Sequence, residues 1–335
     1  MTLPGIEEKV AFLSRPDAYP DCFQRVEIRQ THRSWVFLTE KHAWKLKKPV
    51  RTEYLDFSTP EARRRNCLRE VRLNRRLAKS VYLGVAALTM DRQGNLQLDG
   101  HGKTVDYLVQ MRRLPSNRML DSLIVRHEVS KKDVLKLASM LANFYKKATP
   151  VSMTASRYCK RLAADLENAR RDLTRTRCGL DRDLAESVIR PQLDFLDKNS
   201  DLLEARTREG TILEAHGDLR PEHICLEAQP VIIDCLEFNR SLRILDAASE
   251  LSFLALECER LGAPEIGKQL VDVYREQTGD WAPNELLEFY RAYHAAVRAK
   301  IAIWHLKDDD ILDEAHWVAK AEQYLKMTAC MGKAA

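Results

Sequence analysis

Residues 216–223 read HGDLRPEH, and the apolar segment VIID ends at Asp234, sixteen residues after Asp218. Short apolar runs beside these aspartates predict a β-hairpin with one carboxylate at each end. Phosphoryl transfer uses such a pair, because one carboxylate receives or orients the proton of the acceptor hydroxyl while another holds the metal ion that neutralises the triphosphate. The pattern therefore favours phosphoryl-transfer chemistry.

The first part of the chain predicts a small antiparallel sheet with one helix. Residues 26–46 alternate apolar and polar side chains around turn-like breaks, as antiparallel strands do. Residues 60–78 change to a helical period, and alternation returns over residues 81–111 with a turn at Gln93 and Gly94. The predicted apolar face of the helix consists of Cys67, Leu68, Val71 and Leu77.

The rest of the chain is predicted to be mainly helical. The polar segment RRLPSNR at 112–118 is the best linker candidate, and SKKD at 130–133 is typical of a helix N-terminus. Helical spacing resumes at residue 247 after the hairpin. We therefore expect an α+β protein with a nucleotide-binding lobe over residues 1–113 and a helical catalytic and substrate lobe over residues 114–335.

The composition favours a soluble, cytoplasmic protein. The 54 Lys and Arg against 49 Asp and Glu leave a formal net charge of +5, a mild bias toward anionic ligands, so nucleic acid is not an expected partner. The eight cysteines contain no CxxC pair, which argues against a zinc ribbon and for reduced thiols. The acidic N-terminal stretch and the lack of a long apolar run predict neither a signal peptide nor a membrane span.

HGDLRPEH resembles the HGDxxxxN loop of the aminoglycoside phosphotransferase and choline kinase family, and RPE is similar to part of the protein-kinase HRDLKPEN loop. The resemblance implies the two-lobed protein-kinase-like fold and the use of ATP or GTP with Mg²⁺. It also implies that Asp218 is the catalytic base, that His216 is a scaffold residue, and that Asp234 binds the metal. Arg220 stands where protein kinases carry a phosphate-contacting lysine.

A second resemblance concerns the first lobe, where Ala43-Trp44-Lys45 is similar to the VAIK motif. Strand alternation puts Ala43 and Lys45 on one face, and the resemblance implies that Lys45 holds the α and β phosphates. Glu70 in the helix is the expected ion-pair partner, with Glu61 as the competitor. The predicted nucleotide-binding residues are Lys45, Glu70, Ala43, Thr31, Ser34 and Met111.

Several longer strings are similar to a bacterial aminoglycoside phosphotransferase-like subgroup, over most of residues 15–310. They are THRSWVFL, LDFST, VRLNRRLA, DCLEFN and RILDAASELSFL. Members of the subgroup often carry a fused P-loop kinase domain, and this sequence contains no GxxxxGK[ST] string. A partner domain, if the subgroup requires one, is expected from another chain.

The sequence departs from the family pattern at His223, which replaces the asparagine that ligates metal. Imidazole suits Mg²⁺ poorly, because this ion demands hard oxygen donors. Three alternatives follow: His223 binds a softer ion such as Mn²⁺, it hydrogen-bonds Asp218, or turnover is lost and the protein is a nucleotide-binding pseudokinase with a regulatory or scaffolding role.

The second departure is the loop between the first two strands, RQTHRS, which contains no glycine. The backbone amides of residues 31–34, with the hydroxyls of Thr31 and Ser34, are candidates for phosphate contact. The alternative is a plain hairpin turn.

Three further features have a structural and a functional interpretation. Asp246 is interpreted as the N-cap of the helix that follows it. Glu237 and Asn239 are interpreted either as metal or substrate contacts or as an ordinary hairpin edge. The arginines of the helix predicted over residues 60–78 form either a basic surface for a nucleic acid or an acidic partner protein, or a solvated face. These arginines are Arg63, Arg64, Arg65, Arg72, Arg75 and Arg76.

An acidic run near the C-terminus has the same ambiguity. Its carboxylates suit a cationic aminoglycoside or amine, and they also suit the exposed start of a helix. The run consists of Asp308, Asp309, Asp310, Asp313 and Glu314.

Overall fold

The computed structural model describes residues 3–20, 24–52, 55–175, 179–307 and 313–328. Cys22, Cys178, Cys330 and Asp308, Asp309 and Asp310 of the acidic run lie outside these residues. The chain folds as two compact units. The first comprises Met1–Met119 and His223–Leu242, and the second comprises Leu120–Glu222 and Arg243–Ala335. The hairpin that follows HGDLRPEH thus packs with the N-terminal sheet.

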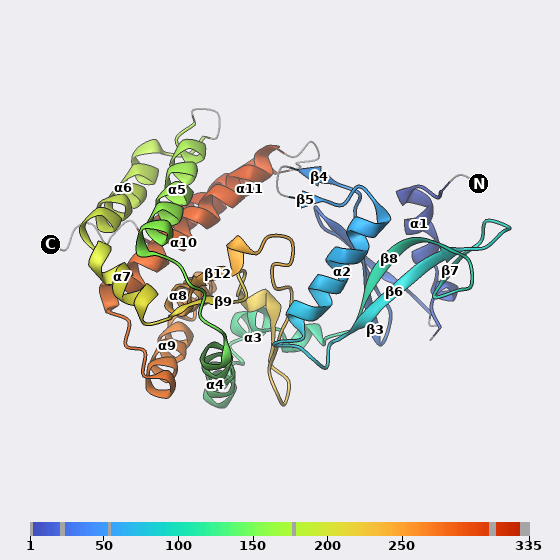
Figure 1. Ribbon diagram of the computed structural model, residues 1–335, viewed down its shortest axis with the longest axis horizontal. Coiled ribbons are helices and arrows are strands. Elements are labelled where there is room, and N and C mark those ends of the chain that lie inside the picture. Colours follow the sequence, from blue (N-terminus) through green and yellow to red (C-terminus); the bar gives the residue numbers. More distant parts are fainter. Residues whose placement is uncertain (1–2, 21–23, 53–54, 176–178, 308–312, 329–335) are drawn as a thin grey trace. The chain divides into compact units, whose positions relative to one another are not determined.

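A six-stranded antiparallel sheet forms the body of the first unit (Figure 1). Its strands follow the order β1-β2-β3-β8-β6-β7 and correspond to the two alternating segments predicted from the sequence. Gly94, with φ of +91°, lies in the predicted turn between β6 and β7. The bounds are β1 Glu27–Gln30, β2 Ser34–Leu38, β3 His42–Lys47, β6 Tyr82–Met90, β7 Leu96–Leu98 and β8 Lys103–Arg112.

Smaller elements complete this unit. Helix α1 (Ile6–Leu13) packs its apolar residues against one face of the sheet, in a core that includes Trp44 and Leu46. A two-stranded ribbon is formed by β4 (Arg51–Thr52) and β5 (Leu55–Asp56), and the predicted catalytic hairpin by β10 (Ile224–Cys225) and β11 (Val231–Ile232).

Helix α2 (Pro60–Asn74) covers the other face and packs on β8 and β6. Thr59 caps the N-terminus of this helix, because its hydroxyl accepts a hydrogen bond from the N–H of Ala62. Pro60 is favourable at the first helical position, because it has no backbone N–H that would need an acceptor. The helix ends four residues before the predicted residue 78, because residues 75–78 turn back toward β6. Leu68 was wrongly placed on the apolar face. It is exposed, because the buried stripe runs through positions 63, 67, 70, 71 and 74 instead.

The prediction for the arginines of this helix is corrected at Arg63, which is buried while the other five arginines are exposed. Arg63 is buried and makes two hydrogen bonds of 2.7 Å to Asp106, which also accepts from Lys9 at 2.8 Å. Arg75 donates to the carbonyl of Tyr82. Arg63 therefore ties the helix to the sheet.

The second unit is helical, as predicted, and contains one two-stranded pair, β9 (Ile212–Glu214) with β12 (Ile244–Asp246). Ser130 accepts the N–H of Asp133 at the start of α4, which confirms the predicted helix N-terminus. No helix in the described ranges is both long and apolar enough to cross a membrane. The helices are α3 Leu120–Val125, α4 Lys131–Lys147, α5 Ala155–Leu173, α6 Arg182–Lys198, α7 Ser200–Arg208, α8 Ala247–Arg260, α9 Pro264–Thr278, α10 Asn284–Trp304 and α11 Glu314–Lys326.

We expect Arg63→Met to destabilise the first unit by about 3 kcal/mol, because a buried carboxylate loses its bidentate partner. The adjacent Arg64 is exposed, pairs with Glu61 and lies 5.8 Å from the ring centre of Tyr107, so Arg64→Met should change stability by less than about 0.5 kcal/mol. The midpoint of urea unfolding measures the stability of both variants relative to wild type. Equal midpoints for the two variants would contradict the structural role of Arg63.

Candidate functional site

Strand β3 presents Ala43, Lys45 and Lys47 on one face, because side chains alternate along a strand. Trp44 and Leu46 fill the core on the opposite face. Two lysines two residues apart thus enter the same polar site.

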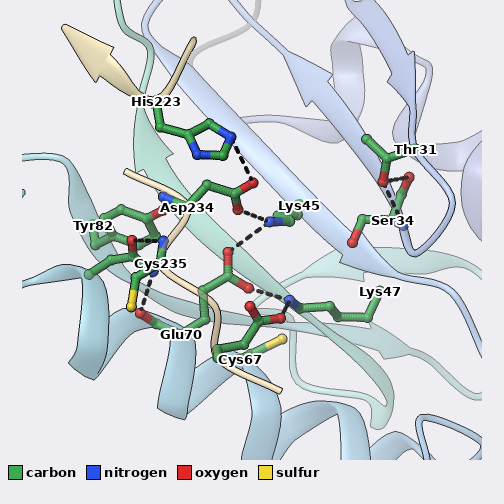
Figure 2. A network of polar contacts seen from close by, with 12 residues as sticks. Thr31, Ser34, Lys45, Lys47, Cys67, Glu70, Tyr82, His223, Asp234 and Cys235 are labelled. Carbon is green, nitrogen blue, oxygen red and sulfur yellow. Dashed lines mark hydrogen bonds and ion pairs between the residues drawn. The ribbon is translucent and has the colours of Figure 1, made fainter. Parts of the chain in front are cut away.

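The Lys45 cluster is the group of charged side chains around these two lysines (Figure 2). The ammonium of Lys45 lies 3.0 Å from Glu70 Oε1 and 2.7 Å from Asp234 Oδ1. The ammonium of Lys47 pairs with Glu70 and lies 2.6 Å from Glu237 Oε1. The cluster consists of Lys45, Lys47, Glu70, Asp234 and Glu237.

The carboxylate of α2 that pairs with Lys45 is Glu70. Glu61, the alternative, is at the exposed start of the helix and pairs with Arg64. Glu70 is fully buried and bridges both lysines, so it fixes the distance between β3 and α2. A buried carboxylate between two ammonium groups is compensated, whereas an unpaired one would be very costly.

Electrostatics keep the cluster ionised. Burial alone would lower the pKa of Lys45, but Asp234 and Glu70 more than reverse this and hold its pKa well above the ordinary value. Burial would raise the pKa of Asp234, but Lys45 and His223 hold its pKa far below the ordinary value. Both groups are therefore charged at neutral pH.

The backbone of Asp234 is held in an unusual conformation. Its φ is +62°, in the left-handed region that non-glycine residues seldom occupy. The N–H of Asp234 donates to the Tyr82 hydroxyl at 3.1 Å, and the N–H of Cys235 donates to Asn74 Oδ1 at 2.9 Å. Tyr82 and Asn74 thus position the backbone that carries the Asp234 carboxylate, a role that no sequence pattern indicates.

His223 lies at the open end of the same hairpin. Its carbonyl accepts the N–H of Ile233 at 2.9 Å, which extends the pairing of β10 with β11 by one step. Its Nε2 is 3.7 Å from Asp234 Oδ2. The imidazole therefore faces the predicted metal ligand.

The side chains of Asp234 and His223 suit a metal ion that is bound together with a triphosphate. Within the described ranges, no group of three or more His, Cys, Asp and Glu side chains is arranged to hold an ion. Mg²⁺ is commonly held by one or two carboxylates with phosphate and water oxygens, so the half-exposed Asp234 fits it. The His223 nitrogen suits a softer ion.

Ala43 and Met111 face each other across β3 and β8. Both are buried in one apolar cluster with Cys225 and Val231 of the hairpin. The predicted nucleotide-binding residues Ala43 and Met111 thus lie in one apolar cluster, and Ala43 is on the same face of β3 as Lys45.

The turn between β1 and β2 uses most of its polar groups internally. The N–H of Thr31 donates to the carbonyl of Ser34, and the N–H of Ser34 donates to Thr31 Oγ1 at 3.0 Å. These bonds occupy two of the amides considered for phosphate contact. The guanidinium of Arg33, in the same turn, stacks over the Phe238 ring at 4.0 Å.

Glu237 proves to be an ion-pair partner of Lys47, a contact that neither interpretation of the sequence included. Asn239 accepts from the N–H and hydroxyl of Ser241, as an ordinary loop residue does. Lys47 was missed as well, although its position two residues after Lys45 is a signal for a shared strand face.

Asp218 and Arg220 belong to the second unit, where the loop after β9 carries them. Gly217 has φ of +88°, a conformation that favours glycine. The N–H groups of His216 and Gly217 donate to Glu250 of α8 at 2.9 and 2.6 Å, and the Tyr145 hydroxyl donates to the same carboxylate. Glu250 is thus the anchor of the HGD loop, which the sequence analysis did not identify.

Two arginines flank the carboxylate of Asp218. Arg220 Nε lies 3.2 Å and Arg298 Nη1 lies 4.0 Å from Asp218 Oδ1. Asp246, in contrast, is structural as predicted: it caps α8 by accepting the N–H of Ala248, and it pairs with the buried Arg206. Asp313 likewise caps α11 by accepting the N–H of His316.

Comparisons with known proteins identify the fold. No family model matches the chain. An uncharacterised protein of Mycobacterium tuberculosis is 34% identical over 286 residues, which cover 82% of this chain and 54% of that protein, and an uncharacterised protein of Mycobacterium bovis matches equally. The chain therefore spans about half the length of the curated relatives it matches.

Two solved structures are similar over nearly the whole chain. A choline/ethanolamine kinase family protein from Mesorhizobium loti is 14% identical, with 98% of this chain and 94% of that chain covered and a TM-score of 0.58. The GDP complex of aminoglycoside 2'-phosphotransferase-IIIa is also 14% identical, with 98% and 100% covered and a TM-score of 0.53. The chain has the protein-kinase-like fold of these kinases, which confirms the predicted fold class.

We expect the ion pair of Asp234 to stabilise the folded protein at neutral pH and to lose this contribution in acid. Its folded pKa is lowered, so the stabilisation is present above the ordinary Asp pKa of about 4 and disappears as the pH falls through the lower folded pKa. The gap in unfolding midpoint between wild type and Asp234→Asn should be constant from about pH 8 to pH 5 and narrow below about pH 4.

Glu40→Gln, at an exposed position of the same unit, is the control and should leave the midpoint near that of wild type throughout. A gap between wild type and Asp234→Asn that stays unchanged down to about pH 3 would contradict the lowered pKa of Asp234.

Proposed function

We propose that this protein is a phosphotransferase that moves the γ-phosphate of ATP or GTP to a hydroxyl of a small-molecule acceptor. The observation that carries the proposal is the Lys45 cluster, in which Lys45 meets Glu70 and Asp234 within 3.0 Å. A buried lysine held ionised beside a half-exposed carboxylate suits a triphosphate and its metal ion. The fold, shared with aminoglycoside and choline kinases, supports the same chemistry.

Each residue has a role in this proposal. Lys45 binds the α and β phosphates, Glu70 orients Lys45, and the apolar surface of Ala43 and Met111 receives the base. Asp234 would hold Mg²⁺, which when bound neutralises the triphosphate. The turn that contains Thr31 and Ser34 covers the phosphates through the groups it does not use internally.

Asp218 is the proposed general base, and Arg220 stabilises the transferring phosphoryl group. The acceptor oxygen forms the new bond to the γ-phosphorus as the bond from that phosphorus to the β–γ bridging oxygen breaks. The hydroxyl proton passes to Asp218, and the nucleoside diphosphate leaves. Glu250 contributes indirectly, because it fixes the backbone before Asp218.

We expect Asp218→Asn to lower kcat by about 10²- to 10⁴-fold, the usual contribution of a positioned general base, with nucleotide affinity nearly unchanged. Transfer of labelled γ-phosphate across a metabolite panel measures turnover, and a thermal-shift titration with ATP or GTP and Mg²⁺ measures binding. Asp272→Asn, at an exposed position of the second unit, is the matched control. Full turnover in Asp218→Asn would refute the role of base.

The second candidate function is a nucleotide-binding pseudokinase with a regulatory or scaffolding role. It is favoured by His223, whose imidazole stands 3.7 Å from Asp234 where the family pattern has an asparagine. The two functions differ in the effect of His223→Asn. A pseudokinase should bind nucleotide without turnover and gain Mg²⁺-dependent turnover in His223→Asn, whereas an active enzyme turns over before the change.

We expect Lys45→Met to weaken nucleotide binding by about 10- to 100-fold, the loss of one or two charge-assisted hydrogen bonds. The thermal shift produced by saturating nucleotide should shrink accordingly. Lys41→Met, at an exposed position just before β3, is the control. If nucleotide raised the melting temperature of Lys45→Met as much as that of wild type, the nucleotide would have to bind away from Lys45.

A further inference from the structure

A second charged cluster lies beside Asp218 and is not used by the chemistry above. Its centre is Arg298 of α10, whose Nη1 is 4.0 Å from Asp218 Oδ1 and whose Nε is 3.5 Å from Glu257 Oε1. The guanidinium also lies 5.9 Å from the ring centres of Phe253 and Tyr324. Contacts from α8 and α11 therefore hold a cation next to the proposed base.

Positive charge exceeds negative charge around this arginine. The buried carboxylate of Glu257 is shared by Arg298, by Arg260 at 2.9 Å and by the Tyr324 hydroxyl at 2.7 Å. Arg298 also approaches Asp218, and Arg260 also contacts Glu222. With Arg220 and Lys320 counted, four cations therefore share three carboxylates at this place. The Nε atom of Arg298 is buried and has no hydrogen-bond partner within the described ranges.

Lys320 adds a third cation to the same region. It lies on α11 one turn before Tyr324, and it forms no ion pair with any residue that the structure describes. Tyr324, one turn away on the same helix, has its ring centre 5.8 Å from Arg260 and 5.9 Å from Arg298, and the Lys320 ammonium lies 5.2 Å from the ring centre of Trp317. Burial and repulsion by Arg260 and Arg298 lower the pKa of Lys320, although Glu257 opposes this. A half-buried lysine beside arginines is stabilised by an anion and not by an amine.

The remaining groups at this place do not offset the charge. His294, one turn before Arg298 on α10, is half-buried, and desolvation lowers its pKa to about 3, so it is neutral. It lies 2.9 Å from Ser249 Oγ and stacks on Phe253. Glu222 is engaged by Arg260 at 3.3 Å.

We infer that the acceptor of this protein carries an anionic group, a phosphate or a carboxylate, which Arg298 and Lys320 bind while its hydroxyl is presented to Asp218. The inference rests on the proposed phosphotransferase function and names its substrate class. Arg and Lys are the side chains that recognise phosphate and carboxylate oxygens. A cationic acceptor, which the acidic run near the C-terminus suggested, would be repelled here.

The first test measures the binding of inorganic phosphate by calorimetry, without nucleotide. Lys320→Met is the informative variant, because its loss strands no carboxylate among the described residues. Its phosphate affinity should be at least about ten-fold weaker than that of wild type, as for a lost charge-assisted hydrogen bond. Lys326→Met on the same helix, where Lys326 is exposed and pairs with Glu322, should bind as wild type does. Equal affinity in Lys320→Met and wild type, or no binding to either, would overturn the inference.

The second test compares acceptors that differ in charge on one hydroxylated ring: glucose 6-phosphate, glucose and glucosamine. The anionic member should be the preferred acceptor, and Lys320→Met should lower its kcat/KM at least about ten-fold without changing the nucleotide KM. Preference for glucosamine or glucose, or a change confined to the nucleotide KM, would overturn the anionic acceptor and leave the phosphotransferase intact. Phosphate binding that depends on Lys320, with no transfer to any acceptor, would support the anion site and count against the proposed function.

Discussion

The ion pairs of Lys45 with Glu70 and Asp234 are the interaction on which the proposed chemistry depends. They join three segments that are far apart in sequence: strand β3, helix α2 and the end of the hairpin β10–β11. Two lysines on one strand face need compensating carboxylates once they are largely removed from water, and α2 supplies Glu70 while the segment after β11 supplies Asp234 and Glu237. The charge balance that stabilises the first unit therefore also assembles the groups proposed to bind a triphosphate and its metal.

The second unit also uses buried carboxylates to hold the residues around its part of the proposed site. A buried carboxylate, Glu250, accepts the backbone N–H groups of the loop that carries Asp218, and another, Glu257, holds two arginines near it. Both lie on α8, about two turns apart, among apolar neighbours. Buried acids thus order the loop that carries the proposed base and the cations around it.

Much of the fold could be predicted from the sequence. Period-2 and helical patterns located the sheet, α2 and the hairpin, because those patterns report directly on which face is buried. Side-chain partners were less accessible. Leu68 fits the same helical pattern as its buried neighbours but is exposed. Arg63 and Arg64 are both arginines, and Arg63 is buried because it contacts Asp106 of β8, which no local sequence pattern indicates.

The site shows the same division between motif and context. The strings HGDLRPEH, VIID and AWK predict roles for Asp218, Asp234 and Lys45, because phosphoryl transfer restricts these residue types and spacings. Tyr82, Asn74 and Glu250 act through backbone N–H groups of distant segments, so only the structure identifies them.

A structure of the protein with a non-hydrolysable nucleoside triphosphate and Mg²⁺ tests the central claim most directly. The account predicts that Lys45 keeps Glu70 and turns from Asp234 to the phosphates, that Asp234 ligates the metal, and that the γ-phosphate lies next to Asp218. Nucleotide bound away from Lys45, or a γ-phosphate out of reach of Asp218, would contradict it.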